Sequence, residues 1–205
     1  MMPRPTIGTN ACMMRTNAFL SGAVSNSKRW KPIPVLSVGI ADSDCGYAAN
    51  TEKAAVQCPQ FPALNEAELK PMQKADTPKA YTVEDVAAML KVPTSKLIKL
   101  LLFMADGKPV VALVRGDHEL NEAKFRAFLK CEELLKADEE TYTRVTGSFV
   151  GFAGAQGLKQ KHPELPIYAD NYVKGVVNGV SGGNEKDVHM LNVTPLRDIQ
   201  VDAYA

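Results

Sequence analysis

The spacing of apolar residues along the chain predicts regular secondary structure only after about residue 77. Residues 1–74 show no sustained period and carry scattered prolines, which is typical of extended or weakly ordered chain. We therefore predict two parts, a leader over residues 1–74 and a compact domain over residues 75–205.

Three segments of the compact domain have the spacing of short amphipathic helices. Val83, Val86 and Leu90 fall on one helical face. Thr82 and Asp85 form an N-cap pattern at the start of this segment, and Pro93 ends it. The same reasoning predicts two further helices, over residues 121–130 and 138–145.

Runs rich in β-branched and apolar residues predict strands. Residues 97–104 and 109–115 are two such runs, joined by a turn that contains Asp106-Gly107, a typical hairpin signal. Further strands are predicted near residues 166–169, 176–180, 188–193 and 199–201, with the last two forming a pair. Helices interspersed among hairpin-like strands indicate an α+β domain with a mixed sheet, not a regular βαβ array.

The charge of the chain is unevenly distributed. The formal net charge is +1, but residues 1–41 hold five Lys or Arg and no acid, so the remainder carries a net charge of −4. This excludes a broad basic surface for nucleic acid on the compact domain, and any RNA would have to be held locally. No apolar run approaches the roughly 20 residues of a membrane helix, so no membrane association is expected.

The sequence supports neither a metal nor a cofactor. Its four cysteines are widely spaced without a C-x-x-C pair, and no phosphate loop or dinucleotide motif is present. A cytoplasmic location is the default expectation. The basic, acid-free start also resembles an organellar transit peptide, so organellar targeting stays open as an alternative.

Two ionisable residues fall on apolar faces of predicted strands. Lys99 alternates with Leu101 and Phe103, and His189 shares a face with Leu191. One interpretation is structural, with Lys99 reaching solvent at a sheet edge and His189 satisfied within the core. The other is that both side chains point into one pocket.

Glycine-bearing stretches could border such a pocket. They cover residues 115–117, 151–154 and 179–184. Glycine permits close approach of a ligand to the backbone, so N–H groups of residues 151–154 could bind an anion or an oxyanion. The alternative is that these glycines only turn the chain.

Several segments resemble one known family in the right order. "TPKAYTVEDVAAMLKVP", "LIKLLLFMADGKPVVALVRGDHELNEAK", "VGFAG" and "GGNEKDVHMLNV" resemble the editing insertion domain of bacterial prolyl-tRNA synthetases, a member of the YbaK-like aminoacyl-tRNA deacylases. "CGYAANTEKA", residues 45–54, resembles the synthetase sequence just before that insertion. The resemblance implies a mixed, largely antiparallel sheet, or partial barrel, with flanking short helices.

The same resemblance implies a set of site residues. Its editing-pocket residues match Thr77, Lys99 and His189, with Val83 and Val86 setting the pocket size. Gly183 and Asn184 match the turn before the histidine, and Gly151 and Gly154 match the loop expected to bind the oxyanion. The family loop has a G-x-x-x-P pattern, in which this chain has Ala155 in place of proline, so its loop should be less rigid.

The function implied is hydrolysis of mischarged Ala-tRNA(Pro), without cofactor or metal. Lys99 would anchor the 3′ end and His189 would position the substrate or a water molecule. The implied partners are the alanine-carrying acceptor end of tRNA(Pro) and a prolyl-tRNA synthetase, and we expect a monomer. Cys-tRNA deacylation, a non-catalytic module that binds an amino acid or tRNA end, and a fragment without a cellular role remain alternatives. The chain would be either free-standing or an excised insertion domain.

Overall fold

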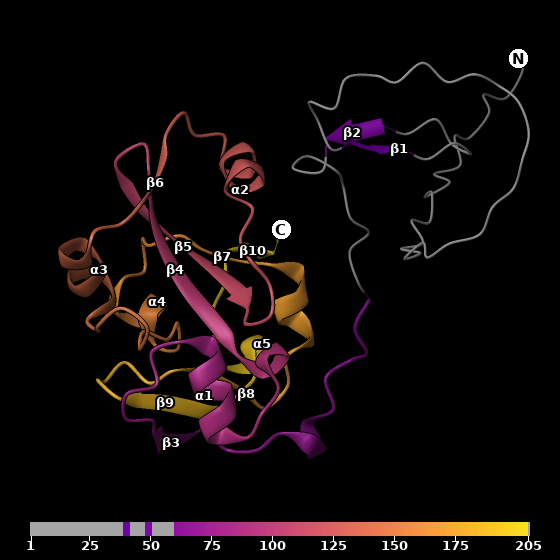
Figure 1. Cartoon of the computed structure of the whole chain (residues 1–205), viewed down its shortest axis with the longest axis vertical. Helices are drawn as coiled ribbons and strands as arrows, with labels where there is room; N and C mark the ends of the chain where they lie inside the picture. The colour runs from indigo at the N-terminus through magenta and orange to yellow at the C-terminus, as the bar shows by residue number, and fades with distance from the viewer. Residues whose placement is uncertain (1–38, 42–47, 51–59, 205) are drawn as a thin grey trace, which may run out of the picture. The chain divides into compact units, whose positions relative to one another are not determined.

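The computed structural model describes residues 39–41, 48–50 and 60–204 (Figure 1). The chain divides into two compact units, Met1–Gln57 and Cys58–Ala205. In the first unit, β1 (Gly39–Ala41) and β2 (Ala48–Asn50) pair antiparallel. Most of the predicted leader, including all but residues 48–50 of the synthetase-like segment, lies outside the described residues.

A long hairpin forms the centre of the larger sheet. β4 (Ile98–Ala105) and β5 (Lys108–Arg115) pair antiparallel along their whole length, and Asp106 and Gly107 turn the chain with positive φ angles of 47° and 76°. The predicted hairpin is therefore confirmed. β6 (Leu134–Lys136) lies antiparallel to the end of β4, and β7 (Ile167–Ala169) and β10 (Ala203–Tyr204) add parallel pairs on the other side.

Three further strands make a smaller sheet. β9 (Val188–Val193) lies between β3 (Gln73–Asp76) and β8 (Gly179–Gly182) and is antiparallel to both. Within residues 60–204, a single isolated bridge between Leu97 and Val180 joins the smaller sheet to the larger one, and these sheets do not close into a barrel. The predicted mixed, largely antiparallel α+β fold is confirmed, while β3 straddles the predicted boundary at residue 74.

The helices follow their sequence signals. The side chain of Thr82 accepts the N–H of Asp85, and the Asp85 carboxylate accepts the N–H of Thr82, so a capping box begins α1 (Val83–Leu90). The other two predicted helices are present as α2 (Glu122–Leu129) and α3 (Glu139–Thr146). Short elements complete the domain: α4 (Leu158–Lys161), α5 (Pro195–Asp198) and three 3-10 turns, η1 (Glu66–Glu68), η2 (Thr94–Lys96) and η3 (Asn171–Gly175).

Two strand predictions were wrong. The strand expected at residues 176–180 begins only at Gly179, because Val176 closes the η3 turn with its N–H bonded to the Val173 carbonyl. The strand expected at residues 199–201, and its pairing with residues 188–193, do not form. Pro195 starts α5 there, and the N–H of Ile199 bonds to the Pro195 carbonyl, so it is unavailable to a sheet.

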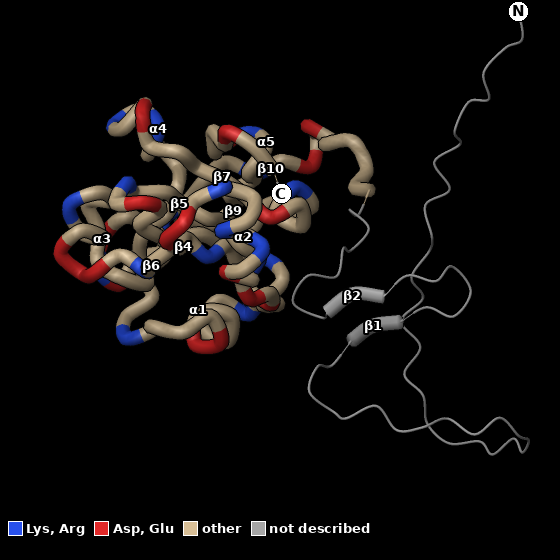
Figure 2. The backbone as a smooth tube through the Cα atoms, turned by 90° about the horizontal axis from the view of Figure 1, so that it is seen from above, with Lys and Arg blue, Asp and Glu red and all other residues tan. Residues whose placement is uncertain are grey.

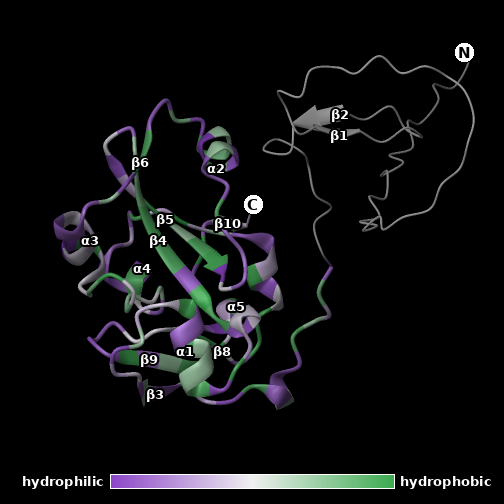
Figure 3. Ribbon diagram, viewed as in Figure 1, coloured by the Kyte–Doolittle hydropathy of each residue, from purple (hydrophilic) through white to green (hydrophobic). Residues whose placement is uncertain are grey.

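The hairpin is buried on both faces, which explains its nearly continuous apolar sequence (Figure 3). Ile98, Leu100 and Leu102 face the main core, whereas Phe103 packs with Phe125 of α2 on the opposite face. β6 pairs only with the end of β4, and β8 meets β4 only near Leu97. The edge of β4 between those two contacts borders the cavity described next.

Candidate active site

A cavity of about 320 Å³ lies beside this edge of β4. Its volume is at the lower end of the roughly 300–1,000 Å³ range of ligand pockets, which suits a small group. Most of its walls are apolar. The lining residues are Tyr81, Thr82, Val83, Val86, residues 97–103, Lys136, Ala137, Tyr142, Val150, Gly151, Ala153, Val180, Ser181, Gly182 and His189.

A buried histidine–threonine pair lies at one end of the cavity. The register of β3 against β9 sets Ala75 opposite His189, so the chain delivers Thr77 beside the histidine ring. Thr77 Oγ1 and His189 Nδ1 are 2.6 Å apart, and both residues are buried. Thr77 is further held by its N–H, which donates to the carbonyl of Asp187 at 2.7 Å.

The surroundings of His189 favour its neutral form. Burial lowers the pKa of His189 below its usual 6.5, because the charged imidazolium loses its hydration. The Phe152 ring packs edge-to-face against the imidazole, with the ring centroids 5.6 Å apart, and adds an apolar contact. A neutral imidazole has one donor and one acceptor nitrogen. With Nδ1 engaged by Thr77, Nε2 is the nitrogen left to act in the cavity.

The loop over residues 149–155 is held against the β8–β9 turn. Asn184 connects the two segments by two hydrogen bonds. Its side-chain oxygen accepts a hydrogen bond from the N–H of Gly154 at 2.8 Å, and its backbone N–H donates one to the Phe152 carbonyl at 2.9 Å. Gly183 supports the turn by donating to the Val188 carbonyl at 3.0 Å. Neither Gly183 nor Asn184 lines the cavity, so both act through the loop.

Close backbone approach makes glycine necessary in two facing positions. A Cβ atom on Gly182 would overlap the backbone of Phe152 and Ala153, and one on Gly154 would overlap the Gly182 carbonyl. Only glycine allows the loop to lie this near β8. The resemblance-based match of Gly154 thus has a packing reason.

The loop offers fewer free N–H groups than its glycines suggest. The N–H of Gly154 is occupied by Asn184, that of Phe152 bonds to the Phe149 carbonyl, and neither Gly154 nor Ala155 borders the cavity. Ala155 is instead buried in the main core. Gly151 and Ala153 do line the cavity.

Tyr142 of α3 is a polar cavity residue without a sequence signal for it. Burial raises the pKa of Tyr142 to about 12, although a hydrogen bond from the backbone of Gly151 to its hydroxyl opposes the rise. The phenol therefore keeps its proton at neutral pH. It can accept from Gly151 and still donate to a bound group.

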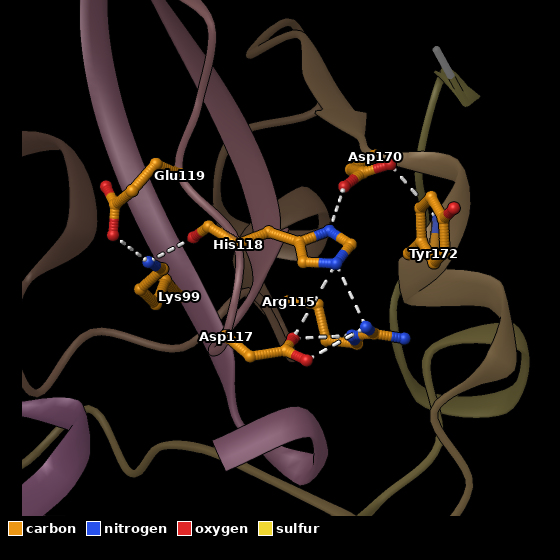
Figure 4. Close-up of polar contacts among 7 residues, drawn as sticks. All are labelled: Lys99, Arg115, Asp117, His118, Glu119, Asp170 and Tyr172. Carbon is orange, nitrogen blue, oxygen red and sulfur yellow. Dashed lines mark hydrogen bonds and ion pairs between the residues drawn. The ribbon is translucent and has the colours of Figure 1, made fainter. Parts of the chain in front are cut away.

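Lys99 borders the cavity, but its ammonium group is already engaged (Figure 4). Nζ donates to the carbonyl of His118 and to Glu119 Oε1, the latter at 2.8 Å. The Lys99 side chain is 17% exposed and that of Glu119 is 94% exposed, so this ion pair lies where water competes with it. An anion could replace Glu119 at little cost.

A polar cluster holds the segment that carries the His118 carbonyl. The guanidinium of Arg115 binds Asp117 at 2.6 and 2.9 Å, and this partner lowers the pKa of the Asp117 carboxyl. The His118 ring contacts Asp170 at 3.2 Å and meets Tyr172 edge-to-face at 4.6 Å (Figure 4). The 115–117 stretch thus orders the chain beside Lys99 and does not line the cavity.

The cavity gathers part of the sequence-predicted set directly. Lys99, Gly151, Val83, Val86 and His189 line it. Three polar residues that the sequence did not single out also line the cavity: Tyr81, Lys136 and Tyr142. Ser181 and Gly182 line it too, and they belong to the 179–184 stretch that was predicted to border a pocket.

Charge is mixed over the domain. Lys and Arg segments are interspersed with Asp and Glu segments (Figure 2). Within the described ranges, no group of three or more His, Cys, Asp or Glu could hold a metal ion, and no helix is long and apolar enough to cross a membrane.

The site is thus a small, mostly apolar cavity that contains a buried histidine, built on an α+β scaffold. The chain belongs to the aminoacyl-tRNA editing domain family, which it matches over residues 77–199. The resemblance seen in the sequence is thereby confirmed.

The curated relatives connect the domain to prolyl-tRNA synthetase. The proline–tRNA ligase of Elusimicrobium minutum (strain Pei191) is 63% identical over 166 residues, which cover 81% of this chain and 29% of the ligase. That of Geobacter sulfurreducens is 49% identical over 167 residues, covering 81% and 28%. The chain thus spans less than a third of the length of these relatives.

A solved structure shows the same fold. A protein described as a candidate trans-editing enzyme for prolyl tRNA synthetase superposes with a TM-score of 0.55 at 21% identity. The match covers 64% of this chain and 85% of that one. The family match and these relatives together show that the chain contains an aminoacyl-tRNA editing domain related to prolyl-tRNA synthetase.

Proposed function

We propose that this domain hydrolyses the ester of alanine-charged tRNA(Pro). The observation that carries the proposal is the cavity itself, in which apolar Val83 and Val86 share a small space with neutral His189. A space of about 320 Å³ suits a small aminoacyl group. The relation to proline–tRNA ligases supports tRNA(Pro) as the carrier.

Hydrolysis needs a positioned water, since an aminoacyl ester is already activated. The oxygen of water attacks the ester carbonyl carbon, the bond from that carbon to the ribose oxygen breaks, and a proton passes to the ribose oxygen. The products are free alanine and uncharged tRNA. In the tautomer in which Nδ1–H donates a hydrogen bond to Thr77, Nε2 of His189 accepts a hydrogen bond from the water. In the other tautomer Nε2 carries the proton and donates a hydrogen bond to the substrate.

The developing oxyanion needs donors inside the cavity. We assign this role to the N–H of Ala153, which borders the cavity and for which no partner is found among residues 60–204. The hydroxyl of Tyr142 is the second donor, because its pKa of about 12 keeps it protonated. Lys99 binds a phosphate of the 3′ end, which replaces Glu119 as the partner of the Lys99 ammonium group.

Selectivity follows from size. Val83 and Val86 of α1 narrow the cavity, so alanine enters and the bulkier, ring-closed proline is excluded. A synthetase site that accepts proline cannot strongly reject a smaller residue, which is why a second, smaller site is useful. Cysteine is close to alanine in size, so cysteine-charged tRNA is the competing substrate.

One observation favours a second function, a non-catalytic module that binds an aminoacyl end. Asn184 occupies the N–H of Gly154, which leaves the loop with few donors for an oxyanion. Such a module would bind aminoacyl-tRNA without accelerating hydrolysis.

The test is deacylation of Ala-tRNA(Pro), Cys-tRNA(Pro) and Pro-tRNA(Pro) by the purified chain, measured against spontaneous hydrolysis. We expect rapid loss of the alanyl ester with the prolyl ester spared, and a strong decrease in rate for His189→Ala and Lys99→Ala. No acceleration on any of the three esters would reject the catalytic proposal, and tight binding without hydrolysis would select the binding module.

A further inference from the structure

Tyr81 is an exposed aromatic residue at the mouth of the cavity. It lines the cavity wall, yet 61% of its surface is accessible. Val150, 55% exposed, also lines the cavity. Scattered exposed apolar side chains are common on soluble domains. Tyr81 is distinguished because it is aromatic, lines the cavity and is at the same time largely open to solvent.

Successive ring contacts connect Tyr81 to the buried histidine. The rings of Tyr81 and Phe152 pack edge-to-face with their centroids 5.8 Å apart, and those of Phe152 and His189 pack in the same way at 5.6 Å. Phe152 is buried and belongs to the loop clasped by Asn184. The position of Tyr81 is therefore set by the same loop that shapes the site, while most of the tyrosine stays open to solvent.

We propose that Tyr81 is the stacking platform for the terminal adenine of the acceptor strand. This inference rests on the proposed function. The aminoacyl group is esterified to the ribose of the last nucleotide, so an aminoacyl group inside the cavity places that nucleoside at the mouth. The terminal base has no pairing partner, and its exposed ring faces are what an accessible tyrosine binds.

A cation among the lining residues agrees with a nucleotide at the cavity. Lys136 lines the cavity as an exposed cation, and its ion pair with Glu122 is long, at 3.4 Å, between exposed side chains. Glu84 and Asp85 lie in the first turn of α1, two and three residues after Thr82. We therefore expect the phosphates to lie near Lys136 and away from this acidic turn.

The experiment is a double-mutant cycle on binding with the full chain. The probes are two acceptor-stem RNA hairpins that carry alanine through a non-hydrolysable amide, one ending in adenosine and the other in an abasic nucleotide. Kd is measured by fluorescence anisotropy for the wild type, Tyr81→Ala and Tyr81→Phe. Phe149→Ala is the matched control, because Phe149 is a 52% exposed aromatic that does not line the cavity.

The wild type should bind the adenosine-ended RNA about 5- to 150-fold more tightly than the abasic one, since base–aromatic stacking contributes roughly 1–3 kcal/mol. Tyr81→Ala should lose this preference, and Tyr81→Phe and Phe149→Ala should keep it. A general folding defect would weaken the binding of both RNAs equally and would leave the preference for the adenosine-ended RNA intact.

Three outcomes would overturn the assignment. One is a wild type without preference for the adenosine end, and another is a Tyr81→Ala variant that retains the preference. If either occurs while the wild type still deacylates Ala-tRNA(Pro), only the role of Tyr81 is rejected. The third is a wild type that neither binds nor deacylates, and it removes the proposed function as well.

Discussion

The hydroxyl of Thr77 lies 2.6 Å from Nδ1 of His189, although 112 residues separate them in the chain. The pairing of β3 with β9 brings the two residues together. Buried polar groups are costly unless each finds a partner, and here the two satisfy one another. The contact explains how the histidine is oriented within apolar walls, while burial favours its neutral form.

The first prediction concerns stability and pH. Because burial lowers the pKa of folded His189 below 6.5, the unfolded chain binds the proton more readily. The contribution of His189 to stability is therefore fully present above about pH 6.5 and is lost as the pH falls toward the folded pKa, with a limiting slope of about 1.4 kcal/mol per pH unit. Urea unfolding of the wild type between pH 8 and pH 5 should show this loss.

His189→Gln should remove that part of the pH dependence. His162→Gln is the control, because the His162 side chain is 37% exposed and does not line the cavity. It should keep the wild-type profile. Equal slopes in wild type and His189→Gln would contradict the prediction.

Much of the fold was predictable because its signals are local. The capping box of Thr82 and Asp85 and the Asp106-Gly107 turn act within a few residues, and both form as expected. β3 escaped prediction because residues 73–76 are mostly exposed and lack an alternating pattern, so only pairing with β9 makes them a strand. Such pairing depends on partners distant in the sequence.

The site was predictable only in part, for a related reason. Motifs identified His189, Lys99 and Val86, which line the cavity, but not the partner that each one has. Two such contacts are the ion pair of Lys99 with Glu119 and the hydrogen bond from the N–H of Gly154 to Asn184. Both depend on how side chains lie across the folded domain, which the sequence does not reveal. Tyr142 lies in no motif, and Tyr81 lies within a family-like segment that does not single it out, so only the cavity reveals their place in the site.

The second prediction concerns Glu119. In the proposed mechanism the Glu119 carboxylate competes with a substrate phosphate for the ammonium of Lys99, and the Glu119 side chain is almost fully exposed. Exposed ion pairs are weak, so Glu119→Gln should lower the KM for Ala-tRNA(Pro) only by roughly 1.4- to 5-fold. Steady-state deacylation at low salt measures the change.

The gain should depend on Lys99. Adding Glu119→Gln to Lys99→Ala should give no further decrease in KM. Glu164→Gln controls for the removal of an exposed acid, since Glu164 pairs with His162 and does not line the cavity. An equal gain in the Glu164→Gln variant would show a general charge effect instead.

The third prediction concerns the size of the cavity. Val83→Ala enlarges the cavity at the side that, in the proposed mechanism, excludes proline. The ratio of kcat/KM for Pro-tRNA(Pro) to that for Ala-tRNA(Pro) should therefore rise by at least roughly 10-fold. Val92→Ala is the matched control, because Val92 packs against the same small core as Val83 but does not line the cavity. A similar rise in both variants would mean that loosened packing, not cavity size, admits proline.

The fourth prediction concerns the exposed cation at the cavity wall. Each backbone phosphate that a protein neutralises on single-stranded nucleic acid contributes a slope of roughly −0.7 to the dependence of log K on log salt. If Lys136 contacts one phosphate, Lys136→Gln should weaken binding of the alanyl-amide RNA and make the slope less negative by about that amount. Lys161→Gln, on α4 and outside the cavity, should leave both unchanged. An unchanged slope in Lys136→Gln would place the acceptor strand on another side of the mouth, while a preserved preference for adenosine in the same variant would keep the stacking role of Tyr81 intact.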